Sequence, residues 1–179
     1  MGKKVLILSG SPRKSGNSDI LCDEFMRGAA ESGHSVEKIR VAEKNIAFCK
    51  GCGVCQKTGS CVTKDDADEI LQKMIDADVI VLASPIYFFT ISAPLKTLIE
   101  RTFARGKEIC DKDFYYLLSA ADGSPSDADI AVSCFRGYAA CVKGAREKGI
   151  LLAMGVYEKG AVKDTAYPEK AREMGRNIV

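Results

Sequence analysis

Short apolar runs alternate with longer amphipathic segments along the whole chain, and this alternation limits the possible folds more than any other feature. Buried-strand patterns occur at residues 3–10, 34–42, 78–84, 113–121 and 150–158. A helical pattern follows each of them, at residues 18–33, 64–77, 95–106, 127–149 and 168–179. Apolar spacing of three or four residues indicates helices, and short β-branched runs indicate buried strands. The repeats predict an α/β fold, a doubly wound five-stranded parallel sheet with helices on both faces.

Length and charge set further limits. The 179 residues are 46% hydrophobic and 28% charged, with a formal net charge of +2. These values predict one domain over residues 1–179. They give no reason to expect a nucleic-acid or membrane partner. The basic start precedes an apolar run of only Val5 to Leu8, so we expect no signal peptide. A cytoplasmic protein with reduced thiols is therefore expected.

The loops after the strands are where a ligand is expected, because doubly wound sheets bind ligands at the carboxyl ends of their strands. The segments "GSPRKSGNS" (10–18), "SPIYFFTISAP" (84–94) and "ADGSPS" (121–126) follow the first, third and fourth strands. These three loops are the candidate site.

The first loop has the composition of a phosphate site. Residues 9–18 supply four serine hydroxyls, one amide, Arg13 and Lys14, ahead of a helix N-terminus that favours anions. Asn17 stands where a Walker A loop needs lysine, and the G-x-G-x-x-G fingerprint is absent. The loop therefore suits the single phosphate of a mononucleotide. The alternative is a polar turn in which Asn17 or Ser18 caps the helix.

The second loop carries three aromatic residues in a row, Tyr87, Phe88 and Phe89, just after Pro85. Aromatic side chains at the carboxyl end of a strand favour a planar ligand. They could instead cap the core, where most aromatic residues lie.

Together, "GSPRKSGNS" and "ASPIYFFTISAPLKTLIER" resemble the flavodoxin-like NAD(P)H-dependent FMN reductase family, and the resemblance covers nearly the whole chain. It implies the strand order 2-1-3-4-5, bound FMN and a homodimer or homotetramer. The FMN phosphate would be held by Ser9, Ser11, Pro12, Arg13, Asn17 and Ser18. The isoalloxazine ring would lie against Ser84, Pro85, Ile86, Tyr87 and Phe88. The far side would be closed by Ala121, Asp122 and Gly123.

The resemblance also implies a function. The protein would be an enzyme that takes electrons from NAD(P)H onto FMN and passes them to a small-molecule or protein acceptor. FMN carries the chemistry, so no catalytic side chain is expected. One alternative is a flavodoxin-like electron carrier without catalysis, although such carriers tend to be strongly acidic. Another is a quinone or azo-compound reductase, which differs only in its acceptor.

Half of the eight cysteines fall in "FCKGCGVCQKTGSC", residues 48–61, at Cys49, Cys52, Cys55 and Cys61. The C-x2-C-x2-C run is typical of 4Fe-4S ligands. It resembles the iron–sulfur flavoprotein branch of the same fold, in which four such cysteines hold one 4Fe-4S cluster beside FMN. A ferredoxin could then be the electron donor. A zinc site, a redox-active thiol pair and four reduced thiols remain alternatives. The other four cysteines lack ligand spacing, and we expect them to be buried: Cys22, Cys110, Cys134 and Cys141.

Overall fold

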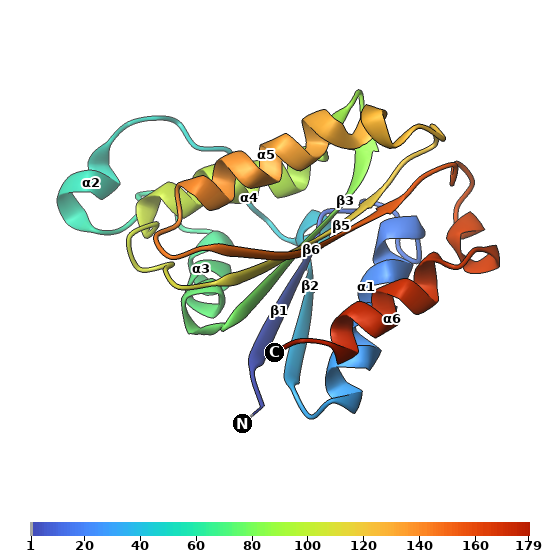
Figure 1. Ribbon diagram of the computed structural model, residues 1–179. Helices are drawn as coiled ribbons and strands as arrows, with labels where there is room; N and C mark the ends of the chain where they lie inside the picture. The colour runs from blue at the N-terminus through green and yellow to red at the C-terminus, as the bar shows by residue number, and fades with distance from the viewer. Residues whose placement is uncertain (1) are drawn as a thin grey trace.

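The computed structural model describes residues 2–179 and contains a parallel sheet in the order β2-β1-β3-β5-β6 (Figure 1). Its strands are β1 (Lys4–Ser9), β2 (Ser35–Arg40), β3 (Val79–Tyr87), β5 (Asp113–Ser119) and β6 (Arg146–Ala153). A short strand, β4 (Thr90–Ile91), folds back antiparallel on the end of β3. Without β4, the order is the predicted 2-1-3-4-5, so the predicted fold class is confirmed.

Helices cover both faces of the sheet (Figure 1). One face carries α1 (Asn17–Glu31) and α6 (Tyr167–Arg176). The other carries α3 (Ala67–Asp76), α4 (Ala93–Arg101) and α5 (Asp129–Ala140). The short helix α2 (Val54–Thr58) belongs to the cysteine segment, which projects away from the sheet. Among residues 2–179, no helix combines the length and apolar character needed to cross a lipid bilayer.

The central strand β1 explains why the sheet has two hydrophobic cores. Leu6 and Leu8 pack with α3, α4 and α5, whereas Val5 and Ile7 pack with α1 and α6. Successive side chains of a strand point to opposite faces, so a strand covered on both sides is apolar throughout. The uninterrupted apolar run that predicted β1 is therefore a consequence of its central position.

The fourth long helix ends earlier than its sequence pattern predicts, so that predicted boundary is wrong. The helical pattern was expected to continue to Gly149, but α5 ends at Ala140 and β6 begins at Arg146. Gly144 turns the chain with a φ of +71°, a conformation that favours glycine. Arg146 and Glu147 then pair with β5. Both are good helix formers, and strand pairing at the sheet edge overrides that preference.

Helices α1 and α6 approach each other at two glycines. A Cβ atom added at Gly28 would overlap the backbone carbonyl oxygen of Arg172, and one added at Gly175 would overlap that of Phe25. The two helices therefore touch backbone to backbone, and neither glycine can be enlarged without moving a helix.

We expect Gly28→Ala to destabilise the protein by about 3 kcal/mol, because the added methyl group overpacks this contact. Gly137→Ala is the matched control, since Gly137 lies in α5 with open space around it. That change should be neutral or stabilise the protein by up to about 1 kcal/mol. Urea unfolding of both variants measures the difference. Equal stability of the two variants would contradict the close helix contact.

Candidate functional site

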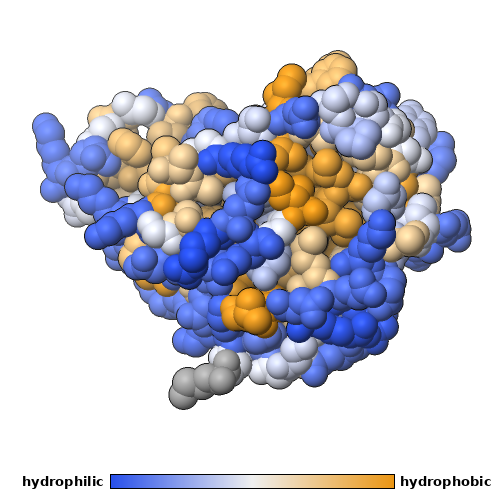
Figure 2. Space-filling view, in the orientation of Figure 1, coloured by the Kyte–Doolittle hydropathy of each residue, from blue (hydrophilic) through white to orange (hydrophobic). Residues whose placement is uncertain are grey.

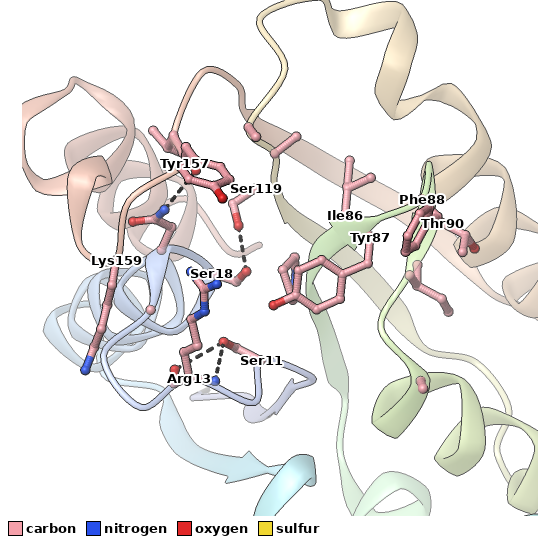
Figure 3. Close-up of a pocket in the computed structure, with 18 residues that line it drawn as sticks. Ser11, Arg13, Ser18, Ile86, Tyr87, Phe88, Thr90, Ser119, Tyr157 and Lys159 are labelled. Carbon is pink, nitrogen blue, oxygen red and sulfur yellow. Dashed lines mark hydrogen bonds between the residues drawn. The ribbon is translucent and has the colours of Figure 1, made fainter.

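A cleft of about 640 Å³ opens at the carboxyl ends of the central strands (Figure 3). It lies between the loop that precedes α1, the end of β3 with β4, and the loops that follow β5 and β6. Of the predicted cofactor residues, it is lined by Ser11, Arg13, Asn17, Ser18, Pro85, Ile86, Tyr87, Phe88 and Ala121. All three predicted loops therefore contribute to one cavity.

The loop before α1 presents a helix N-terminus to this cleft. Helix α1 begins at Asn17, and its N-cap is Gly16, which has no side chain to occupy the free N–H groups of the first turn. Ser11 shapes the turn, because its hydroxyl donates to the Arg13 carbonyl at 3.1 Å and accepts from the Arg13 N–H at 3.3 Å. Pro12 is exposed and lies outside the cleft lining. The arrangement suits an anionic group.

Asn17 has a different role from the one its sequence position suggested. Its amide nitrogen donates to the carbonyls of Val156 at 3.0 Å and Glu158 at 2.9 Å. Its amide oxygen accepts from the Val162 N–H at 3.2 Å. The side chain is thus used to fasten the loop after β6 against α1. What Asn17 offers to a ligand is its backbone N–H.

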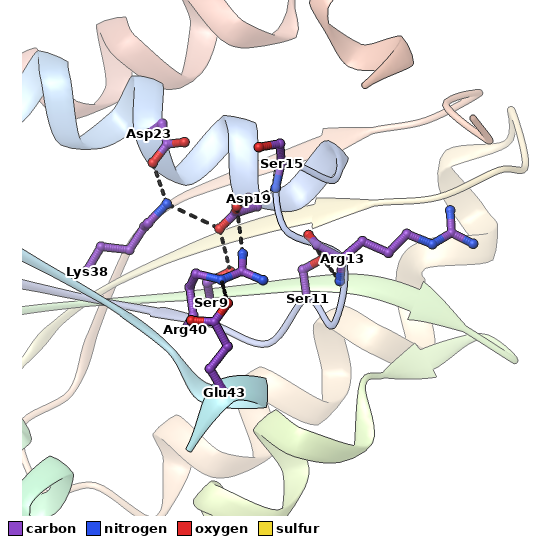
Figure 4. A network of polar contacts seen from close by, with 9 residues as sticks. All are labelled: Ser9, Ser11, Arg13, Ser15, Asp19, Asp23, Lys38, Arg40 and Glu43. Carbon is purple, nitrogen blue, oxygen red and sulfur yellow. Dashed lines mark hydrogen bonds and ion pairs between the residues drawn. The ribbon is translucent and has the colours of Figure 1, made fainter. Parts of the chain in front are cut away.

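The loop between β1 and α1, residues 10–16, is the phosphate-type loop. A buried carboxylate, that of Asp19, lies behind it (Figure 4). Asp19 accepts hydrogen bonds from the Ser9 hydroxyl at 3.3 Å and from the Ser15 N–H at 2.9 Å. It also pairs with Arg40 at 2.6 Å and Lys38 at 3.2 Å. Ser15 has a φ of +55°, so Asp19 holds the loop in a left-handed turn that a serine seldom adopts alone. Ser9 therefore supports the loop from behind and lies outside the cleft lining.

The neighbours of Asp19 favour the ionised form of its carboxyl group. Burial disfavours its charge, but the Ser15 N–H and the charges of Lys38 and Arg40 outweigh burial and hold the pKa of Asp19 below its usual value. The carboxylate is thus a fixed negative charge, neutralised on the side away from the cleft.

The aromatic loop is fastened to the phosphate-type loop by two serines. Ser84 is buried, and its hydroxyl donates to the Pro85 carbonyl at 2.7 Å and accepts from the Ser92 N–H at 2.8 Å. The Ser92 hydroxyl donates to the Gly10 carbonyl at 2.8 Å. Ser84 therefore lies under the cleft wall, outside its lining, and sets the position of Tyr87.

The β3–β4 turn places two aromatic residues at its tip. Phe88 and Phe89 have φ values of +49° and +64°, the arrangement of a two-residue hairpin turn in which asparagine and glycine are usual. Phe88 is 98% exposed, although its inner edge lines the cleft. The alternative that these aromatic residues cap the core is wrong for Phe88, because its side chain is almost fully exposed.

The loop after β5 is only partly at the cleft. Ala121 lines it, whereas Asp122 lines an adjoining hollow of about 240 Å³ and Gly123 lines neither. The Ser119 and Ser18 hydroxyls meet at 2.8 Å and join β5 to α1.

Sequence reasoning missed the contribution of the loop after β6. Val156, Tyr157 and Lys159 all line the cleft, and Figure 3 labels Tyr157 and Lys159. The carboxyl end of β6 lies at the same sheet edge as the other loops, and that was the signal available in the sequence. Lys159 is a second basic residue of the lining, in addition to Arg13. Neither residue forms an ion pair within the described chain, so both positive charges are available to an anion.

The four predicted metal ligands also share a cavity. Cys49, Cys52, Cys55 and Cys61 all line one hollow of about 290 Å³. Three glycines in this segment have left-handed backbones, with φ values of +65° to +73°, and no atoms within 4 Å of an added Cβ: Gly51, Gly53 and Gly59. Within residues 2–179, no three histidine, cysteine or acidic side chains are already grouped to hold a metal ion. The thiols face a common space without converging on one point.

Arg101, at the end of α4, anchors the cysteine segment. It pairs with Asp65 at 2.6 Å, and both side chains are almost fully buried. Burial disfavours the charge of Arg101, but Asp65 and, more weakly, Cys61 outweigh it and raise the pKa of Arg101 above its usual value. Arg101 was not among the residues named from sequence, because its partners lie more than thirty residues away.

The remaining cysteines follow the sequence expectation in part. Cys22 is fully buried, and burial raises the pKa of its thiol to about 12. Cys110 and Cys134 are partly buried. Cys141 is exposed, so the expectation of burial is wrong there. It follows the last turn of α5, where the next residue, Val142, is the one that packs into the core.

Fold and cleft together define a doubly wound α/β protein with a helix N-terminus at a cleft beside the carboxyl ends of its strands. A family model described as NADPH-dependent FMN reductase matches residues 3–162. The chain therefore belongs to the NADPH-dependent FMN reductase family, as its sequence motifs indicated.

Iron–sulfur flavoproteins are among the similar curated proteins. One from Methanocaldococcus jannaschii is 46% identical over 99 residues, 55% of this chain and 51% of that protein. One from Archaeoglobus fulgidus is 39% identical over 103 residues, 58% of this chain and 47% of that protein. The chain thus spans about half the length of these relatives.

Solved structures support the fold. An FMN-dependent NADH-azoreductase from Bacillus anthracis, in complex with FMN, has a TM-score of 0.75 at 16% identity, covering 98% of both chains. An NAD(P)H:quinone oxidoreductase from Methanothermobacter marburgensis has a TM-score of 0.72 at 18% identity, covering 99% of this chain and 97% of that one. At these identities the likeness establishes the fold alone.

The Asp19 network predicts a pH dependence of stability. A folded-state pKa below the unfolded value, about 3.9, stabilises the protein above that pH, and the contribution is lost as the pH falls through the folded pKa. Asp19→Asn should therefore cost about 2 kcal/mol at pH 7. The gap to wild type should close below about pH 4. Denaturant unfolding at several pH values tests this.

Asp164→Asn is the control for that experiment, because Asp164 is exposed and forms no ion pair within the described residues. Its stability should follow wild type at every pH. A gap for Asp19→Asn that stays constant down to pH 3 would contradict the assignment of Asp19.

Proposed function

We propose that the protein binds FMN in the 640 Å³ cleft and uses it to pass electrons from NAD(P)H to an acceptor. The observation that carries this proposal is the joining of a helix N-terminus and two unpaired cations to an apolar, aromatic wall in one cavity. The volume is within the range of small-molecule sites. When bound, FMN supplies the redox chemistry, accepting a hydride and releasing electrons singly or in pairs.

The residues of the cleft divide this work between them. The N–H groups at the start of α1, together with Arg13 and Lys159, would bind the phosphate. Ile86 and Tyr87 would pack against the flavin ring, and Ala121 would lie on its far side. Ser9, Ser84 and Asn17 would act indirectly, because their side chains fix the loops that form the walls. No side chain needs to transfer a proton for this function.

The predicted 4Fe-4S cluster is the second part of the proposal. The residues fit such a group, because all four cysteines and no other cysteine line the 290 Å³ cavity, and its glycine-rich segment has open space to contract around a cluster. The iron–sulfur flavoprotein relatives support the same reading. Cys49, Cys52, Cys55 and Cys61 would each supply one thiolate. A cluster would exchange single electrons, and such a centre suits a ferredoxin as donor or acceptor.

Partners and assembly follow from the same proposal. A nicotinamide would donate electrons, and a small molecule or an electron-transfer protein would accept them. A homodimer or homotetramer is supported by the exposed aromatic side chains around the cleft, Phe88, Phe89 and Tyr157. Figure 2 shows apolar side chains gathered near the middle and upper edge of one face, while hydrophilic ones dominate lower down. All eight cysteines are free thiols, which fits a reducing compartment such as the cytoplasm.

The phosphate role of the first loop is tested by Arg13→Ala. Its guanidinium lines the cleft, and its loss should weaken FMN binding about tenfold, the effect of one charge-assisted hydrogen bond. Lys14→Ala is the matched control, since Lys14 is the neighbouring cation outside the lining. Quenching of FMN fluorescence measures both affinities. Equal loss in the two variants would show only a general charge effect. Steady NADH or NADPH oxidation by the FMN-loaded protein would exclude the non-catalytic carrier.

The cluster is tested by Cys52→Ala. Because this change removes one of four thiolates, the variant should lose most of its iron and acid-labile sulfide while it keeps FMN. Cys141→Ala is the control, because Cys141 is exposed and lines only an adjoining cavity. It should keep wild-type iron. Iron, sulfide and flavin are assayed on anaerobically prepared samples of each protein. Equal iron in both variants would refute the cluster.

A further inference from the structure

One buried side chain holds both ends of the cysteine segment. The Nη1 atom of Arg101 donates to the Ala47 carbonyl at 2.8 Å, and its Nη2 atom donates to the Thr63 carbonyl at 3.2 Å. Both nitrogens also donate to Asp65, at 2.6 and 3.1 Å. Ala47 lies just before the first cysteine and Thr63 just after the last. The guanidinium thus closes the loop that carries all four thiols.

One donor of this guanidinium is unused. Arg101 is only 3% exposed, and its Nε atom has no hydrogen-bond partner among the described residues. Arg101 lines the same cavity as the four cysteines. Burying an N–H group without an acceptor is unfavourable. The Nε–H group of Arg101 therefore calls for an acceptor that the described residues do not supply. Sulfur atoms of a bound cluster would be such acceptors.

We propose that Arg101 is the positioning residue of the cysteine segment and that its permanent positive charge raises the reduction potential of the 4Fe-4S cluster. The inference rests on the proposed cluster. Reduction adds one electron, from reduced FMN in the protein or from dithionite in a titration. No bond breaks and no proton is taken up, so the cluster with its thiolates becomes one unit more negative. A fixed cation beside it stabilises the reduced form more than the oxidised form.

Asp65 makes the proposal sharply testable. Its carboxylate accepts from Arg101 and from the Ala47 and Ala67 N–H groups, so it fastens the same loop and partly neutralises the guanidinium. Removing either partner loosens the loop, but the two changes alter the local charge in opposite senses. A purely structural role would move the potential in one direction for both.

The experiment is a redox titration of the full chain after anaerobic reconstitution, followed by absorption and electron paramagnetic resonance. Arg101→Gln should lower the cluster potential, and Asp65→Asn should raise it. The expected size is about a tenfold change in the one-electron reduction equilibrium, which corresponds to about 59 mV. Arg105→Gln is the control, because Arg105 pairs with Glu108 outside the cysteine cavity. The cluster potential of this variant should match that of wild type.

Shifts of opposite sign support the inference. Shifts in the same direction, or none, overturn it while the cluster stands. If Arg101→Gln loses its iron, Asp65→Asn decides, and its potential must rise. Wild-type protein without iron overturns the proposed cluster itself, which the iron assay detects separately.

Discussion

The parallel pairing of β1 with β3 is the constraint on which the cleft depends. Parallel strands end at the same edge, so the loop after β1 and the loop after β3 must meet there. Hydrogen bonds then fix their relative position, since Ser92 reaches both the Gly10 carbonyl and, through its N–H, the Ser84 hydroxyl. The sheet supplies the meeting point, and these short polar contacts define the shape of the wall.

Buried ion pairs lie beneath both candidate sites. Asp19 with Arg40 supports the phosphate-type loop, and Arg101 with Asp65 supports the cysteine segment. Such pairs contribute little net stability, because desolvation offsets much of the attraction. Their consequence here is geometric. Asp19, Arg101 and Asp65 also bond loop backbone atoms, so a loop with little regular structure has a defined position. This explains how short glycine-containing loops can present ligand groups in a fixed arrangement.

The sequence predicts what depends on pattern, and it fails where distant segments decide. The apolar runs of the central strands were sufficient for the parallel α/β fold, and the composition of residues 9–18 was sufficient for Arg13 at the cleft, whereas the strand order came from the family resemblance. The bonding of Asn17 to the loop after β6 depends on where that loop lies in space. The place of Lys159 in the cleft lining also depends on where the loop after β6 lies in space. Residues 146–149 have helical preferences, and only pairing with β5 makes them a strand. Binding of a cluster requires the four thiols to converge on one point. Their spacing in the sequence fixes only part of that geometry.

Helix α4 connects the two candidate centres. Ala93, its first residue, lines the cleft, and Arg101, its last residue, lines the cysteine cavity. Nine helical residues span about 12 Å. The preceding residue, Ser92, is bonded to the phosphate-type loop, so the helix is fixed at both ends. A rigid helix of this length would set the separation between the two cofactors within one chain. The segment "PLKTLIER" therefore joins the two candidate sites in addition to covering the sheet, and its terminal arginine lines the cysteine cavity.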